Sequence, residues 1–339
     1  MRDVSFRWGF VGVGQGGCRI AESFFSLGYK DCIFLNTATV DLGGVNAPES
    51  NKLVIGSEGS GAGKDPEVGE SAAHESQAEI LHLLTQLGEC EQIFICAGAG
   101  GGTGTGATMP VFDMISSMYK DIPIGIIASM PGKGELVSDA TKKNAAQLLN
   151  KCCDMADADE LRPFIVIDND LVRRNVKPKS LRTLWHDGNR AFSGLLHKLN
   201  VLSSTPTMLV SLDKADLRTL MFKPGTLYVG SRTIDNPQDE KLVRTHLDLA
   251  FKTSTMLHSD NKISESDCAC VLTMPSSILD GDVQFFDLFA DVVDKYLTSM
   301  PNSYIHRGIY EDEASNRIRA ITLSVGEAAP RSSIRKRLR

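Results

Sequence analysis

The amino-acid sequence predicts an α/β protein in which a parallel sheet wrapped by helices is followed by a smaller α+β domain. Up to about residue 170, short apolar runs rich in Ile, Val and Phe alternate with longer segments of helical period, which is typical of a parallel sheet covered by helices. After residue 206, strand-like and helix-like segments follow in a different order. A chain of 339 residues is long enough for two domains with separate cores.

Six strands are expected in the first domain, at residues 6–13, 32–35, 52–55, 92–96, 122–129 and 163–167. A helix is expected at 19–27, after the first strand. Glycine clusters follow several of these strands at their carboxyl ends. An open α/β sheet binds its ligands at that edge, so the glycine clusters mark the expected site.

A long helix is expected over 181–203, where leucines and Phe192 are spaced to bury one face. The second domain is expected to contain helices at 214–222, 238–255 and 284–297 and strands at 226–231, 268–275 and 318–325. We therefore divide the chain into a first α/β domain at 1–180, a connecting helix at 181–205, a smaller domain at 206–326 and a flexible basic tail at 327–339.

The strongest single motif is a loop with six glycines between residues 98 and 106, directly after an apolar run. Backbone without side chains can turn through positive φ and direct successive N–H groups at one anion. The hydroxyls of Thr103 and Thr105 remain for oxygens or a metal. The pattern predicts a phosphate-binding loop; the alternative is a flexible linker.

A second glycine cluster, Gly12-Val13-Gly14-Gln15-Gly16-Gly17, satisfies the Gly-x-Gly-x-x-Gly dinucleotide pattern. A nicotinamide site needs an acid at the end of the next strand, but that strand ends in Asn36. An oxidoreductase therefore stays a remote alternative. Two such loops in one chain favour a polyphosphate that is held from two sides.

A third segment, residues 55–69, contains Gly61-Ala62-Gly63-Lys64-Asp65-Pro66-Glu67-Val68-Gly69. Together the three segments resemble the FtsZ/tubulin superfamily of filament-forming GTPases, whose fold is a Rossmann-like GTPase domain, a long central helix and a smaller domain. The resemblance implies GTP or GDP as ligand, with Mg²⁺ bound through the phosphates and water and with no protein metal ligand. Lys64 is not a Walker lysine, because no Ser or Thr follows it.

The resemblance also implies which residues hold the nucleotide. Asn169 and Glu135 correspond to the sugar contacts, and Trp185 with Asn189, at i and i+4 of one helix face, to the guanine contacts. Without the resemblance, Trp185 and Asn189 are also compatible with an ordinary buried tryptophan and a solvated asparagine. The residues expected near the phosphates lie in or beside the glycine loops: Gly14, Gln15, Gly16, Gly17, Arg19, Asn36, Gly61, Ala62, Gly63, Gly98, Gly100, Gly101, Gly102, Thr103, Gly104 and Thr105. Asp139 stands where the family carries an arginine after the glutamate.

Residues 208–217 resemble the family's synergy loop, with Asp213 and Asp216 in place of its two acids. In the family this loop enters the site of the next subunit and orients water near the γ-phosphate, so hydrolysis requires assembly. Ser211 replaces the usual asparagine. A filament or regulator with little hydrolysis is therefore a second alternative. The same acids also fit the start of a helix, with Ser211 or Asp213 as N-cap.

Composition places the chain among soluble proteins, with 42% hydrophobic residues and a net charge of −6. No run approaches the ~18 apolar residues that a membrane helix needs, and the amino terminus has no apolar stretch of a signal peptide. We expect a cytoplasmic protein with no transmembrane segment. The eight cysteines lack a zinc spacing and are expected to be reduced and buried.

The last nine residues carry five positive charges, although the chain as a whole is acidic. Such a tail fits contact with a DNA-bound adaptor, a division partner, anionic lipid or the acidic body of a neighbouring subunit, or simply a solubilising terminus. The basic end is similar to that of TubZ-type tubulins, which position DNA, whereas the third loop is closer to FtsZ. Positioning of DNA, a plasmid or a phage and cell division both stay open as roles.

Overall fold

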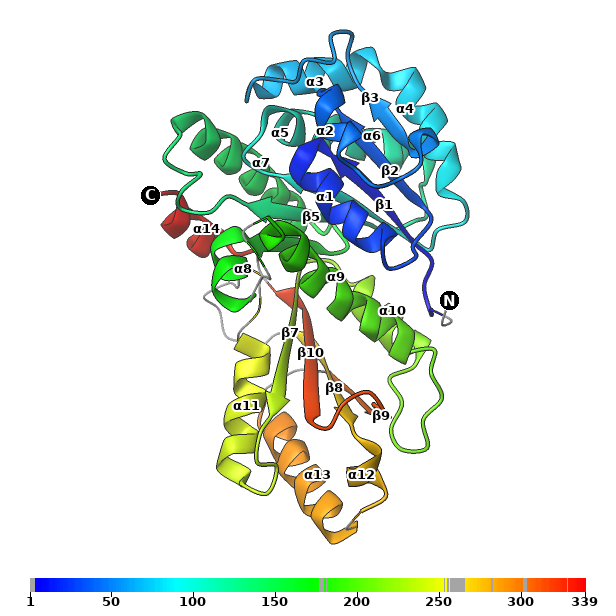
Figure 1. Cartoon of the computed structure of the whole chain (residues 1–339), viewed down its shortest axis with the longest axis vertical. Helices are drawn as coiled ribbons and strands as arrows, with labels where there is room; N and C mark the ends of the chain where they lie inside the picture. The colour runs from blue at the N-terminus through cyan, green and yellow to red at the C-terminus, as the bar shows by residue number, and fades with distance from the viewer. Residues whose placement is uncertain are drawn as a thin grey trace.

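The computed structural model describes residues 4–176, 180, 182–252, 254, 256, 266–281, 283–300, 304–327 and 329–339. Two domains lie one above the other along the long axis, and helix α9 crosses between them (Figure 1). A single ten-stranded sheet runs through both, in the order β3-β2-β1-β4-β5-β6-β7-β10-β8-β9. The sheet is therefore continuous from the first domain into the second.

The six strands of the first domain are parallel, as expected for strands separated by helical crossovers. They are β1 (Trp8–Val13), β2 (Cys32–Asn36), β3 (Lys52–Val54), β4 (Gln92–Gly98), β5 (Ile124–Met130) and β6 (Phe164–Asp168). All six predicted strands are confirmed, with no end displaced by more than two residues. Their carboxyl ends meet at one edge, where the glycine loops begin.

Helices cover both faces of this sheet (Figure 1). They are α1 (Gly14–Phe25), α2 (Thr39–Gly43), α3 (Pro66–Glu75), α4 (Gln77–Leu84), α5 (Gly102–Gly106), α6 (Thr108–Met118), α7 (Asp139–Asp157), α8 (Asn169–Asn175) and α9 (Leu184–Leu202). Short 3₁₀ turns lie at Glu49–Asn51 and Thr85–Leu87. The predicted long helix is confirmed as α9; residue 181, at its predicted start, lies outside the described residues.

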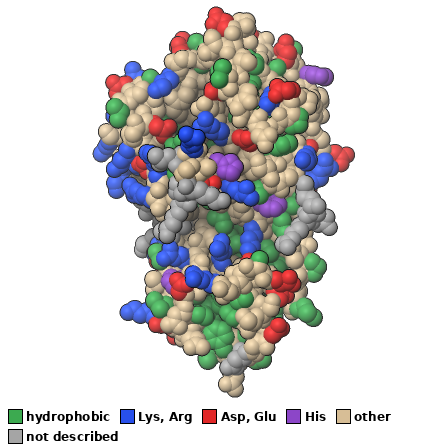
Figure 2. Space-filling view, viewed as in Figure 1, with side chains coloured by type: hydrophobic (Ala, Val, Ile, Leu, Met, Phe, Trp, Pro, Cys, Tyr) green, Lys and Arg blue, Asp and Glu red, His purple; other side chains and the backbone are tan. Residues whose placement is uncertain are grey.

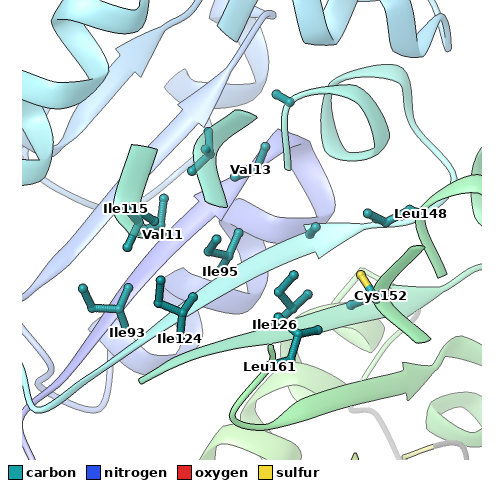
Figure 3. Packing of buried hydrophobic residues seen from close by; sticks show 14 of the residues in the cluster. Val11, Val13, Ile93, Ile95, Ile115, Ile124, Ile126, Leu148, Cys152 and Leu161 are labelled. Atoms are coloured by element: carbon teal, nitrogen blue, oxygen red, sulfur yellow. The ribbon is translucent and has the colours of Figure 1, made fainter. Parts of the chain in front are cut away.

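The core lies on the two faces of the parallel strands. On one face, Val11, Ile95 and Ile126 pack with Ile115 of α6 and Leu148 of α7 (Figure 3). The other face is aromatic: Phe10 stacks on Phe24 of α1 with ring centroids 3.9 Å apart, and Phe192 of α9 packs edge-on against Phe24. Each fully buried side chain of this kind contributes about 1.5–3 kcal/mol, so the loops rise from a rigid base.

The second domain holds β7 (Thr226–Ile234), β8 (Asp267–Met274), β9 (Ile305–Glu311) and β10 (Ile318–Glu327), with helices α10 (Lys214–Met221), α11 (Glu240–Lys252), α12 (Ser276–Leu279) and α13 (Val283–Thr298). Strand β10 runs antiparallel to β7 and β8. The predicted helix at 238–255 ends at Lys252; residues 253 and 255 lie outside the described part. Strand β9 escaped prediction because His306, Arg307 and Gly308 interrupt its apolar pattern.

The flexible tail is the clearest wrong prediction. Residues Arg331–Leu338 form helix α14, which lies against the first domain beside α7 and α8 (Figure 1). Ile334 is fully buried in the first domain's core, and Leu338, one helical turn later, packs against the same cluster. Arg331 pairs with Asp154 and Asp157 of α7 at 2.8 and 2.7 Å. An apolar i, i+4 pair is too short a pattern to reveal this in a basic segment.

Candidate functional site

The first glycine loop joins β1 to α1 and lies directly against the loop that follows β4. Gly14 has φ of +68°, and a Cβ placed on it would lie 2.8 Å from the backbone nitrogen of Gly104. Helix α1 starts at Gly14, inside the glycine cluster, rather than at the predicted residue 19. The two loops approach so closely because neither carries a side chain at the contact.

The third loop packs on the second. A Cβ on Gly102 would lie 2.6 Å from the carbonyl oxygen of Asp65, and Asn144 of α7 donates a 2.9 Å hydrogen bond to the carbonyl oxygen of Lys64. Asp65 caps α3 by accepting from the backbone N–H of Glu67 at 2.9 Å. All three glycine segments thus form one wall.

Between this wall and α9 lies a cavity of about 800 Å³, a size typical of sites for small molecules and cofactors. Eighteen of the twenty residues predicted to hold a nucleotide line it: Gly14, Gln15, Gly16, Arg19, Asn36, Gly61, Ala62, Gly63, Gly98, Gly100, Gly101, Gly102, Thr103, Gly104, Glu135, Asn169, Trp185 and Asn189. Segments far apart in the sequence therefore meet in one site.

Two predicted residues, Gly17 and Thr105, do not line the cavity. A Cβ on Gly17 would lie 2.0 Å from the carbonyl oxygen of Cys96, so this glycine allows α1 to pack on β4. The hydroxyl of Thr105 is buried and donates to the carbonyl oxygen of Ala99 at 3.3 Å. Both residues shape the loops from behind.

The cavity is also lined by an aromatic and amide-rich group of side chains. Trp185 and Asn189 project from one face of α9, one turn apart. Asn169, at the start of α8, donates from Nδ2 to Oε2 of Glu135 at 3.0 Å. The same oxygen accepts from the backbone N–H of Gly132 at 2.8 Å, which fixes the Glu135 carboxylate. This group of side chains offers a ring for stacking, two amides and a carboxylate.

Two further charged residues line the cavity and were not predicted. Asp41 of α2 accepts from Nε2 of Gln15 at 2.7 Å and from Nδ2 of Asn36 at 3.3 Å, which orients both amides. Lys64 has φ of +66° and donates from Nζ to the Thr141 hydroxyl at 3.2 Å. Lys64 was set aside because no Ser or Thr follows it; the hydroxyls at its ammonium come instead from the α7 end.

Asp213 and Asp216 do not belong to the cavity lining of their own chain. They start α10 as a capping box: Asp213 accepts from the N–H of Asp216 at 2.9 Å, and Asp216 accepts from the N–H of Asp213 at 3.2 Å. Nδ1 of His306 lies 2.9 Å from Oδ1 of Asp216, at hydrogen-bond distance. The preceding Met208 is fully exposed.

Residues 9–177 match the family described as "Tubulin/FtsZ family, GTPase domain". The chain belongs to the tubulin/FtsZ family. Among its relatives, the cell division protein FtsZ 1 of Pyrococcus woesei is 32% identical over 225 residues, which are 65% of this chain and 57% of that protein. The tubulin-like protein TubZ of Bacillus cereus is 25% identical over 258 residues, 70% of this chain and 57% of that protein. The chain thus spans a little over half the length of these tubulin/FtsZ relatives.

Solved structures of tubulin/FtsZ proteins share the whole fold. A protofilament of TubZ from Bacillus thuringiensis serovar israelensis superposes with a TM-score of 0.81 at 20% identity, covering 99% of this chain and 91% of that one. CetZ2 from Haloferax volcanii gives 0.75 at 19% identity, covering 97% and 96%. Across the part of the chain that the structure describes, no helix combines the length and apolar character that crossing a bilayer requires.

Proposed function

We propose that this chain binds GTP in the cavity and polymerises head to tail into cytoplasmic filaments that hydrolyse it. One observation carries the proposal: the glycine wall and the Trp185–Asn189 face line the same single cavity. Backbone N–H groups at the start of α1 suit phosphate oxygens. An indole stacks on a purine, and an amide pairs with its polar edge.

The sugar and the terminal phosphate then fall to different residues. Glu135 and Asn169, hydrogen-bonded to each other at 3.0 Å in the lining of the cavity, hold the ribose hydroxyls. Lys64 lies with the third loop in the glycine wall, where a triphosphate is more negative than a diphosphate. Mg²⁺ is proposed as a companion of the phosphates, held through their oxygens and water. Bound there, it would neutralise charge on the phosphates.

Hydrolysis is assigned to the junction between subunits. Asp213 is exposed at the start of α10 and Asp216 is half-buried, and neither lines the cavity of its own chain. A neighbouring subunit supplies them to the γ-phosphate, where carboxylates orient the attacking water. For the biological role, positioning of DNA, a plasmid or a phage and cell division are the two candidates; the relative from Pyrococcus woesei is named as a cell division protein.

Sedimentation with nucleotide tests this proposal. Purified protein with GTP and Mg²⁺ should pellet as filaments, visible by electron microscopy, whereas GDP should leave it in the supernatant. Equal pelleting with both nucleotides would refute GTP-dependent assembly. Phosphate release measured above the assembly concentration separates a hydrolysing filament from one that binds GTP without turnover, the alternative that Ser211 and Asp139 favour.

A further inference from the structure

Helix α14 brings an arginine, Arg337, whose side chain is mostly covered, to the loops that carry the proposed sugar contacts. Figure 2 shows Lys and Arg side chains gathered on the flank of the upper domain, where α14 lies in Figure 1. Arg337 grips Asp168 with two hydrogen bonds, from Nε at 3.1 Å and from Nη2 at 2.8 Å, and also pairs with Asp170. The side chains of Arg337, Asp168 and Asp170 are only 14%, 3% and 13% exposed.

Asp168 needs this partner. It ends β6 and caps α8 by accepting from the backbone N–H groups of Asp170 and Leu171 at 2.7 and 3.3 Å. A carboxylate so deeply buried is costly unless it is paired, and the planar guanidinium fork matches both of its oxygens.

Asp170 extends the contact to a second loop. Its carboxylate accepts from the backbone N–H of Lys133 at 3.3 Å, in the loop that ends at Glu135. Asn169 lies between the two aspartates that Arg337 holds, and it donates to Glu135. One side chain of α14 is therefore linked to both loops that carry the proposed sugar contacts.

We propose that Arg337 is a positioning residue for the nucleotide, which pins the Asn169 and Glu135 loops in place and makes affinity for GTP and GDP depend on the docking of α14. The inference rests on the proposed function, because it concerns the same cavity. It gives the basic carboxyl-terminal segment a role inside its own subunit.

Electrostatics at Asp170 agree with this geometry. Burial is the largest influence and raises the pKa of its carboxyl. The hydrogen bond from Arg337 and that from the Lys133 N–H oppose it, together with the charge of Arg337, and the pKa falls below its usual range. The Arg337–Asp170 pair is therefore fully charged at neutral pH, and this ion pair persists across the physiological pH range.

The test uses the full chain and titrations with fluorescent GTP and GDP analogues. Arg337→Met should weaken binding of both nucleotides at least tenfold and by equal factors, since they share the sugar. Arg335→Met, a change on the exposed side of the same helix, should leave both affinities unchanged. When the rate of hydrolysis is measured over a range of GTP concentrations, Arg337→Met should raise KM. The rate at saturating GTP, and so kcat, should be unaltered, because Arg337 is linked to the loops of the proposed sugar contacts.

The double variant Asp168→Asn with Arg337→Met separates positioning from stability, because it removes the more deeply buried of the two carboxylate charges together with the guanidinium that pairs with it. It should regain most of the wild-type Tm and still bind both nucleotides at least tenfold more weakly. Wild-type affinity in the double variant would overturn the inference, since Arg337 would then only neutralise Asp168. If the wild type itself binds no GTP, the proposed function fails; if it binds GTP and Arg337→Met binds equally well, only this inference fails.

Discussion

Asp213 has two roles that one pair of substitutions can separate. As the N-cap of α10 it accepts from the backbone N–H of Asp216 at 2.9 Å, and as an exposed carboxylate it is proposed to act on the GTP of the next subunit. Asparagine caps a helix about as well as aspartate but carries no charge, whereas alanine has neither a capping oxygen nor a charge. Asp213→Asn therefore removes only the carboxylate, and Asp213→Ala removes both functions.

The magnitudes differ enough to be measured. Loss of an N-cap costs about 1 kcal/mol, which changes the unfolding equilibrium roughly fivefold. Loss of a carboxylate that positions water or accepts a proton costs about 10²–10⁴-fold in rate. We expect Asp213→Asn to unfold in urea like the wild type and to form long-lived filaments with hydrolysis reduced at least about 100-fold. Asp213→Ala should show the same loss of rate and also unfold more easily by about 1 kcal/mol.

Asp239 supplies the matched control. It lies directly before α11 and accepts from the N–H of Leu242, three residues further on, at 3.1 Å, but belongs to a different helix of the second domain. Asp239→Ala should cost a similar stability and leave phosphate release from filaments unchanged. Wild-type hydrolysis by Asp213→Asn would refute the catalytic role, and unchanged stability of Asp213→Ala would refute the capping role.

Three further outcomes are expected. Lys64→Met should weaken GTP binding about 10-fold or more and leave GDP binding unchanged, because a charge-assisted hydrogen bond is worth about 1.5–3 kcal/mol. Lys64→Arg should retain GTP affinity, and an equal loss of affinity for both nucleotides in Lys64→Met would contradict a contact between Lys64 and the terminal phosphate. Gly104→Ala should lower the free energy of unfolding by about 1–3 kcal/mol, because its Cβ would lie 2.5 Å from the Gly98 carbonyl oxygen. Gly101→Ala, whose Cβ meets nothing within 4 Å, should change that free energy by under about 0.5 kcal/mol, and a larger loss for Gly101→Ala than for Gly104→Ala in urea would refute this. All eight cysteines are buried, and burial raises the pKa of Cys90 to about 12, so a thiol reagent at pH 8 should label the native protein far more slowly than the urea-unfolded chain; a fast-reacting native thiol would contradict the packing.

Much of the site was predictable because its parts are local. The glycine loops follow apolar strands, and strand alternation with helices places their carboxyl ends at one edge whatever the details of packing. Trp185 and Asn189 share a helix face through their spacing alone. The sequence excluded Lys64 as a Walker lysine but gave no other role for it, because the hydroxyl that it contacts, on Thr141, lies on another element. Asp41 was missed because an acid in a short helix resembles ordinary surface charge.

The sequence by itself determined the strands of the first domain, the long helix and the identity of the loops that line the cavity, since each depends on periodicity or on residue types a few positions apart. Only the tertiary structure decided that the basic end folds into a helix and that Arg337 meets Asp168, 169 residues away along the chain. Such a pair leaves no local pattern, because its stability depends on burial that arises only once β6, α8 and α14 have packed together.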